Sequence, residues 1–247
     1  LRKVAVSYDG ATNVIQGFDF YLKKGQTAAL RGRSGSGKTS IAYLLLGFLN
    51  SNQGEYLING KPAAAYVGDS IRSKIGYLEQ SVSVFMGTLR ENLVLSDSWI
   101  SDTKIHEVLK ALNLYDLVAS HPRGLDMPIT EAGGGLSGGQ RQLVSIARMM
   151  LREPKLVFMD EPTASMDQNT ESRVITTLKP WLQGRTVLMS THRPQLLEWA
   201  DTIAVVDAGQ CVAFGEKQDM LDKLTRGIDV KGGANPAAAA PAQEVQA

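Results

Sequence analysis

The stretch Gly32-Arg33-Ser34-Gly35-Ser36-Gly37-Lys38-Thr39-Ser40 decides the fold of this chain. Its spacing of glycines, lysine and hydroxyl is typical of a loop that binds phosphate. Glycines let backbone N–H groups curve around an anion without a Cβ atom in the way, the lysine can reach the outer phosphates, and the threonine hydroxyl can bind Mg²⁺. The alternative is a Gly/Ser-rich turn that matches by chance. We call residues 32–40 the phosphate loop.

The residues on either side of the phosphate loop provide the context that such a site requires. Thr27 to Leu30 form a short apolar run that predicts a buried strand, and Ile41 to Leu49 continue as an apolar helix that Thr39 opens. A helix N-terminus favours an anion because its N–H groups are unpaired and its dipole is positive there. We therefore predict a site for a nucleoside triphosphate.

Two carboxylates and a histidine end later strands. Asp160 and Glu161 close an apolar strand predicted over residues 155–161, and His192 follows a strand predicted over residues 186–190. An aspartate at the end of a buried strand is suited to hold Mg²⁺, and a neighbouring carboxylate can orient and deprotonate an attacking water. His192 is expected to face a γ-phosphate.

A second helix start repeats the pattern of an anion site. Leu136-Ser137-Gly138-Gly139-Gln140, which we call the signature segment, leads into an amphipathic helix predicted over residues 141–151. An ordinary Ser-capped helix explains the same residues. Asp167 is expected to cap the helix that runs to Leu182, and a functional role can coexist with the cap.

Tyr8 ends the first of two strands predicted over residues 3–8 and 14–22. A strand-end aromatic ring ahead of a phosphate loop can offer its face to an adenine, and a half-buried strand tyrosine is the other interpretation. Both remain open from the residues alone.

The remaining pattern predicts strands and short helices. Residues 81–152 are expected to form an all-helical insertion, and residues 225–247 an Ala/Pro-rich disordered tail. His106 and His121 have no neighbouring cluster of metal ligands and are interpreted as surface or packing residues. We predict strands over 54–58, 75–78, 203–207 and 210–215, and helices over 70–74, 88–95, 103–112, 115–119 and 217–224.

Composition limits the classes of protein. The 247 residues are 43% hydrophobic, and their formal charge of +1 offers no electrostatic footprint for nucleic acid or an anionic membrane surface. Cys211 is the single cysteine and lies in a predicted strand, so we assign it no chemical role. No apolar run approaches the ~18 residues of a membrane span. Because the chain starts at Leu1 directly before a strand, we expect a piece of a longer polypeptide.

From Val4 to Leu224 the chain resembles the nucleotide-binding domain of ATP-binding cassette (ABC) transporters. This resemblance implies an α/β fold with a phosphate-loop ATPase core of RecA type, an antiparallel β subdomain and an inserted all-helical signature subdomain. The motifs that carry it are Tyr8, the phosphate loop, Gln80, the signature segment, Leu156 to Glu161, Ser165-Met166-Asp167 and His192.

The resemblance also implies roles, cofactors and partners. ATP and Mg²⁺ are the expected cofactors, and a second copy of the domain is expected to pair head to tail, so that the signature segment and Asp167 complete the neighbour's site. Segments near Phe85 and Glu131 are expected to contact a transmembrane domain, at the cytoplasmic face of a bacterial inner membrane. Tyr8 is expected to stack on adenine, Lys38 to neutralise phosphate charge, Thr39, Gln80 and Asp160 to hold Mg²⁺, Glu161 to act as general base and His192 to stabilise the γ-phosphate.

The subtype follows from smaller stretches. Residues 85–92 and 131–133 resemble exporters, and residues 121–126, 161–167 and 191–197 are similar to type I secretion ATPases, which export unfolded polypeptides. The alternatives are an exporter of lipids, drugs or small thiols and, more remotely, a non-transport ABC ATPase. Arg31 and Gly134 depart from the family pattern, and the first places a charge beside the phosphate loop.

Overall fold

The computed structural model describes residues 1–95, 97 and 99–225. The chain divides into two compact units, each with elements from distant parts of the sequence. Unit 1 comprises Leu1–Ile75, Leu156–Phe158 and Gly184–Ala247; unit 2 comprises Gly76–Lys155 and Met159–Gln183. The predicted disordered tail lies outside the described residues except for Thr225, which ends a helix.

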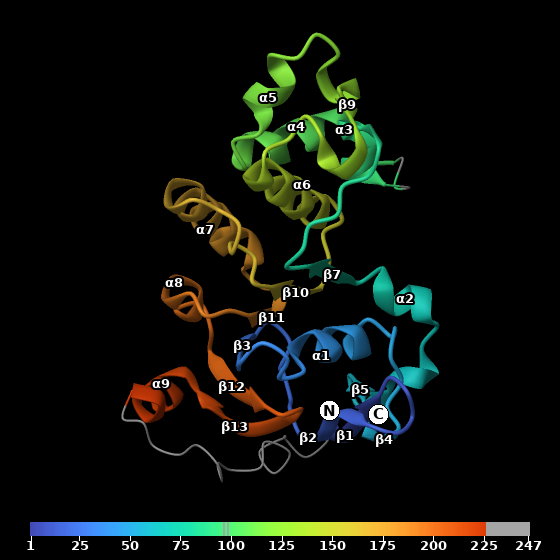
Figure 1. Ribbon diagram of the computed structural model, residues 1–247, viewed down its shortest axis with the longest axis vertical. Helices are drawn as coiled ribbons and strands as arrows, with labels where there is room; N and C mark the ends of the chain where they lie inside the picture. Colours follow the sequence, from blue (N-terminus) through green and yellow to red (C-terminus); the bar gives the residue numbers. More distant parts are fainter. Residues whose placement is uncertain (96, 98, 226–247) are drawn as a thin grey trace. The chain divides into compact units, whose positions relative to one another are not determined.

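Unit 1 is built on a mainly parallel sheet with the strand order β13-β12-β3-β11-β10 (Figure 1). Residues Ala28, Ala29 and Leu30 of β3 are completely buried, because this strand has a partner on each side. The bounds are β3 Thr27–Arg31, β10 Leu156–Asp160, β11 Thr186–Ser190, β12 Thr202–Asp207 and β13 Gln210–Glu216, with β12 and β13 antiparallel.

A smaller antiparallel sheet with the order β2-β1-β4 completes the strands predicted near the N-terminus. Its bounds are β1 Arg2–Ser7, β2 Asn13–Phe18 and β4 Gln53–Glu55. The strand predicted over residues 14–22 is too long, because Asp19 leaves the ladder and accepts a hydrogen bond from the Lys3 N–H at 2.9 Å. The strand predicted over residues 54–58 is in fact two, since Leu57–Ile58 (β5) pairs with Lys61–Pro62 (β6) instead.

Helix α1 (Lys38–Leu45) is shorter than predicted and begins one residue earlier. It ends because Gly47 adopts φ 73° and its N–H bonds to the Leu44 carbonyl at 3.0 Å. The Leu45 carbonyl accepts a 3.1 Å bond from the Tyr56 hydroxyl, whose burial raises its pKa to about 12. The other helices of unit 1 are α2 Gly68–Arg72, α8 Pro194–Leu197 and α9 Lys217–Thr225.

Unit 2 is mostly helical, and α3 and α4 pack against α6 (Figure 1). The insertion is not all-helical, because Gly87–Thr88 (β8) and Pro128–Ile129 (β9) form a two-stranded ladder. Strands of two residues are too short to show the alternation of apolar and polar residues that predicts a strand. Strand β7 (Ile75–Leu78) enters the unit. Its helices are α3 Leu89–Val94, α4 Asp102–Ala111, α5 Tyr115–Ala119, α6 Gly138–Leu151 and α7 Gln168–Leu182.

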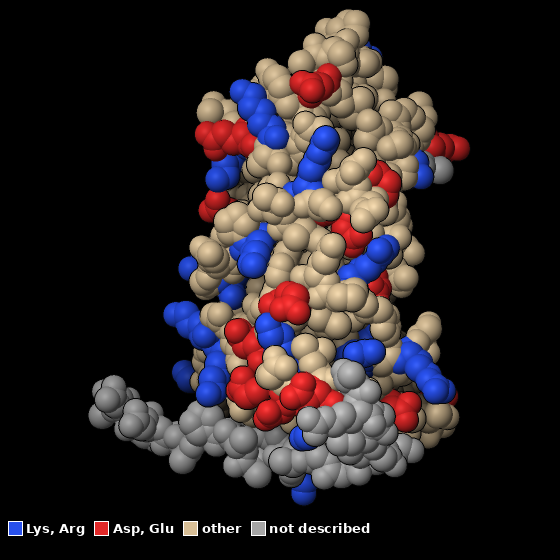
Figure 2. Space-filling view, turned by 90° about the vertical axis from the view of Figure 1, so that its left-hand side faces the viewer, with Lys and Arg blue, Asp and Glu red and all other residues tan. Residues whose placement is uncertain are grey.

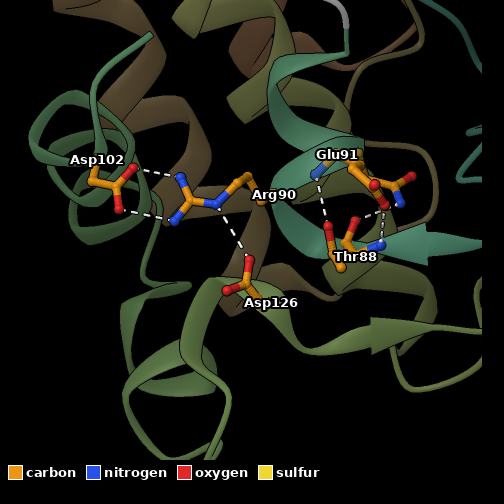
Figure 3. A network of polar contacts seen from close by, with 6 residues as sticks. Thr88, Arg90, Glu91, Asp102 and Asp126 are labelled. Carbon is orange, nitrogen blue, oxygen red and sulfur yellow. Dashed lines mark hydrogen bonds and ion pairs between the residues drawn. The ribbon is translucent and has the colours of Figure 1, made fainter. Parts of the chain in front are cut away.

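Polar contacts fix helix α3 at its start and on its exposed side (Figure 3). Thr88 and Glu91 form a capping box, in which the Glu91 N–H donates to the Thr88 hydroxyl and the Glu91 carboxylate accepts from the Thr88 N–H. Arg90 binds Asp102 through two nitrogens and Asp126 through Nε at 3.3 Å. The hydrogen bond from Arg90 lowers the pKa of Asp102. These contacts join α3 to α4 and to the turn before β9.

The lesser sequence predictions also have structural answers. His106 packs edge-on against the ring of Tyr115, with 5.6 Å between ring centroids, and Nδ1 of His121 accepts a 3.2 Å bond from the Arg123 N–H. His106 therefore packs against a neighbouring ring, and His121 makes a local hydrogen bond to the backbone. Cys211 lies in β13, and burial raises the pKa of its thiol to about 12.

Basic and acidic side chains are interspersed on the face of the molecule drawn in Figure 2. Both signs occur on this face, in keeping with the near balance of 26 basic and 25 acidic residues. Among the helices of the described residues, none has the length and apolar character needed to cross a bilayer.

Candidate active site

The phosphate loop lies in unit 1 between β3 and α1 and depends on two of its glycines. A Cβ atom on Gly32 would lie 2.2 Å from the Val206 carbonyl oxygen, so no larger residue fits there. Gly37 has φ 105°, a conformation that side chains rarely adopt, and precedes the first residue of α1. The loop is also tied to β12–β13, because the Gly209 N–H donates to the Ser36 carbonyl at 3.0 Å.

The charge distribution of the phosphate loop suits an anion. Nζ of Lys38 donates to the carbonyl oxygens of Gly32 at 2.7 Å and Arg33 at 2.9 Å, which holds the ammonium over the loop. Helix α1 has no side-chain cap and no acidic residue in its first turn, so its N-terminal dipole is not compensated there. Ser36 Oγ is buried without a hydrogen-bond partner in the described structure. These features fit the triphosphate that the sequence predicts.

Tyr8 lies beside the phosphate loop, as the adenine interpretation requires. Its hydroxyl and the Ser40 hydroxyl are 3.0 Å apart and hydrogen-bonded, while the side chain is 57% exposed. A ring that is fixed at its tip and open on its face can stack on a planar base. Tyr8 lies one residue past the end of β1, and its role in stacking on adenine stays a prediction.

His192 also belongs to unit 1. It follows β11 and is exposed, whereas Thr191 before it is 1% exposed and accepts a 3.0 Å bond from the Arg193 N–H. This bond fixes the backbone turn from which the imidazole projects.

Asp160 and Glu161 lie in unit 2, on either side of the end of β10. Asp160 is the last strand residue and is 5% exposed. The strand was predicted to include Glu161, but the structure ends it one residue earlier, because Glu161 turns into the left-handed region with φ 45°. The Ala164 N–H then bonds to the Glu161 carbonyl at 3.1 Å. The backbone therefore changes direction directly after Asp160.

The signature segment begins α6 three residues earlier than the predicted helix. Ser137 and Gln140 form a capping box, with bonds of 3.2 Å to the Ser137 hydroxyl and 2.8 Å to the Gln140 side chain. A Cβ atom on Gly139 would meet nothing within 4 Å, so the approach to this residue is open. The structure therefore confirms the Ser-capped helix. The space beside Gly139 is also compatible with the predicted anion site.

Asp167 caps α7 as predicted. Its carboxylate accepts from the N–H groups of Asn169 and Thr170, each at 3.0 Å, and from the Thr170 hydroxyl at 2.6 Å. The hydroxyl bond is the largest cause of the lowered pKa of Asp167. The carboxylate is therefore ionised wherever the fold is intact at neutral pH.

The segment after Gln80 is held by two residues that the sequence analysis missed. Asn92 is completely buried and bonds to both the N–H and the carbonyl of Phe85, at 3.0 and 2.9 Å. Arg148 donates to the carbonyl oxygens of Asn92 and Ser83 at 2.8 and 3.2 Å, and its burial lowers its pKa. Asn92 lies three residues after Leu89, on the apolar face of a predicted helix. A polar residue on that face indicates a buried side chain that needs hydrogen-bond partners, and this pattern could have identified Asn92 from the sequence.

The oxygen atoms predicted to hold Mg²⁺ are of the right chemistry. Hydroxyl, amide and carboxylate oxygens are ligands that Mg²⁺ accepts, and it commonly takes only one or two carboxylates together with phosphate oxygens. Thr39 lies in unit 1, whereas Gln80 and Asp160 lie in unit 2. Within the described ranges there is no cluster of three or more His, Cys, Asp or Glu residues able to bind a metal.

Comparisons with known proteins agree on one family. A family model described as ABC transporter matches residues 15–164. The chain is 35% identical over 223 residues to the ATP-dependent lipid A-core flippase of Saccharophagus degradans, covering 90% of this chain and 38% of the flippase. It is 33% identical over 213 residues to the glutathione/L-cysteine transport system ATP-binding/permease protein CydC of Haemophilus influenzae, covering 86% and 37%.

A solved structure shows the same similarity in three dimensions. The chain superimposes on a bacterial Atm1-family ABC exporter with ATP bound at a TM-score of 0.85 and 30% identity, covering 90% of this chain and 39% of the exporter chain. This chain therefore spans less than two fifths of the length of each of these proteins.

Proposed function

The chain belongs to the ABC transporter family, whose ATP-binding domains hydrolyse ATP with Mg²⁺, and we propose that it is the motor domain of an exporter. The observation that carries this proposal is the similarity to exporters over 86–90% of the chain.

Each predicted site residue has a proposed role in this activity. Bound Mg²⁺ supplies positive charge that offsets the negative charge of the phosphates. Lys38 releases its two loop carbonyls to bind the β- and γ-phosphate oxygens, and Tyr8 stacks on the adenine. Glu161 accepts a proton from the attacking water, and His192 donates a hydrogen bond to a γ-phosphate oxygen.

We further propose that a second copy of the domain completes the site. The open approach to Gly139 at the start of α6 suits the phosphates of a nucleotide held by the partner's phosphate loop, because a helix N-terminus favours an anion. Phe85 and Met86 are apolar and are 44% and 72% exposed, which suits contact with a transmembrane domain. We propose that the segment near Glu131 contacts the same domain. In this proposed assembly the domain lies at the cytoplasmic face of an inner membrane.

For the exported molecule, the lipid, drug and thiol class has more support than polypeptide. The relatives named above are a lipid flippase and a thiol transport protein. Type I secretion, the first prediction from the sequence, stays a prediction that these relatives do not support. Reconstitution in lipid vesicles with the cognate membrane domain tests the choice: ATP hydrolysis stimulated by lipid A or glutathione supports the small-molecule class, and stimulation by an unfolded polypeptide alone contradicts it.

The motor itself is tested with Glu161→Gln. This variant keeps the side-chain shape but removes the base, so hydrolysis should fall at least ~10²-fold while ATP still binds. The variant should run as a dimer with Mg-ATP in light scattering, and adding Ser137→Arg should return it to monomer. Glu107→Gln, which changes an exposed glutamate on α4, is the matched control. A Glu161→Gln variant with the wild-type hydrolysis rate would contradict the proposed mechanism.

A further inference from the structure

Glu161 sits on strained backbone. Its φ of 45° lies in the left-handed region, which a residue with a Cβ atom rarely occupies. Such a conformation persists only where the surroundings determine it, and it is common at functional sites.

One side of the turn is held by α7. The Thr163 hydroxyl donates to Oε1 of Glu171 at 2.7 Å, and these residues are 1% and 5% exposed. The Met166 N–H closes the following turn on the Thr163 carbonyl at 3.2 Å. These bonds fix the chain two residues after Glu161.

The residue next to Glu161 is held by α6. Nε2 of Gln142 donates to the Pro162 carbonyl oxygen at 3.1 Å, and Gln142 is 2% exposed. It is the only polar residue among those that α6 buries. Burial of an amide is unfavourable unless it is hydrogen-bonded, so the bond to Pro162 explains why an amide occurs on this apolar face.

We propose that Gln142 is a positioning residue for Glu161. By holding the carbonyl of the adjacent residue, it fixes the direction in which the Glu161 side chain leaves the backbone. Because Gln142 and Ser137 lie at the start of the same helix, a displacement of the signature segment is transmitted to the carboxylate. This inference rests on the proposed function, in which Glu161 is the base.

The test is Gln142→Met, which keeps an unbranched side chain but removes the donor. The full chain is assayed for Mg-ATP hydrolysis over a range of ATP concentrations. A misplacement of a catalytic group by ~1 Å can lower the rate on the order of 10²-fold. Because Gln142→Met removes only one of the contacts that hold the turn, we expect a smaller fall in kcat, of about 10-fold. KM for ATP should stay within about 2-fold, because the phosphate loop lies in unit 1. Leu143→Met, an apolar swap one residue along α6, is the matched control and should keep the wild-type kcat.

A double-mutant cycle separates positioning from general structural damage. If Gln142 acts through Glu161, Gln142→Met should not lower the residual rate of Glu161→Gln any further. An unchanged kcat in Gln142→Met, a change confined to KM, or an equal loss in the Glu161→Gln background would each overturn the proposal. Gln142→Leu, which also lacks a hydrogen-bond donor and suits the apolar face of α6, is the second variant and should show the same fall in kcat should the methionine variant not fold.

The failure of this inference is distinct from the failure of the proposed function. If Glu161→Gln hydrolyses ATP at the wild-type rate, the assignment of the base fails. If Glu161→Gln is inactive and Gln142→Met is fully active, only the role of Gln142 fails.

Discussion

Asn92→Ala should destabilise unit 2 by removing the residue that ties the segment before α3 to that helix. The Asn92 side chain makes three hydrogen bonds: it accepts from the Phe85 N–H at 3.0 Å and donates to the carbonyls of Phe85 at 2.9 Å and Thr88 at 3.0 Å. Asn92 is completely buried. After its side chain is removed, water can reach the former partners only if the surrounding chain rearranges.

The size of the effect follows from the number of bonds. Each hydrogen bond contributes about 1 kcal/mol net, and a buried group left without a partner costs ~1–3 kcal/mol. Three lost bonds therefore lower the free energy of unfolding by about 3 kcal/mol, a large share of the ~5–15 kcal/mol of an ordinary domain. The Phe85 N–H should also lose its protection, because Asn92 is its acceptor.

Urea unfolding followed by circular dichroism measures the free energy, and hydrogen exchange measured by mass spectrometry reports on the Phe85 segment. Asn169→Ala is the matched control, because Asn169 is exposed at the start of α7. A loss below about 1 kcal/mol in Asn92→Ala, or equal losses in both variants, would refute the view that this side chain organises the segment.

Other substitutions test unit 1. Lys38→Ala should abolish tight ATP binding or turnover, because it removes the ammonium held over the phosphate loop. Lys24→Ala, at an exposed position, is the control. Wild-type ATP hydrolysis in Lys38→Ala would contradict the assignment of residues 32–40 as the ATP-binding loop. Tyr8→Ala should weaken ATP affinity by about 1 kcal/mol in a binding titration. Tyr8→Phe should lie between wild type and Tyr8→Ala, because it keeps the ring and loses the bond to Ser40, and an effect as large as that of alanine would exclude stacking. Tyr56 should titrate near pH 12 by ultraviolet absorbance. Its folded pKa lies above the unfolded value of about 10, so the folded state binds more protons between them, and stability should fall as pH rises through that range.

Much of the fold could be predicted because periodicity and motifs agree. The predicted fold class is confirmed by the family match and the exporter structure. The strands on either side of the phosphate loop and the helices of unit 2 follow from apolar patterns that local propensity supports. Element ends were less predictable: α6 begins at Gly138 because the Ser137 capping box reaches back, and β2 stops at Phe18 because Asp19 bonds elsewhere.

The side-chain contacts around the site could not be predicted, because they join residues far apart in the sequence. Gln142 meets Pro162 across 20 positions, and Arg148 meets Ser83 across 65. Nor does a sequence pattern show that Glu161 adopts a positive φ. The roles of the predicted site residues themselves stay predictions until the variants above are measured.

The half-buried Cys211 has a practical consequence for experiments on domain motion. Because the pKa of the Cys211 thiol is raised to about 12, the thiol is protonated at pH 7, and the thiolate is the reactive form. We therefore expect Cys211 to react more slowly with maleimide and iodoacetamide than an exposed cysteine does. A fluorophore or spin label can therefore be attached through an engineered cysteine at the exposed position of Met86. Cys211 does not have to be replaced first.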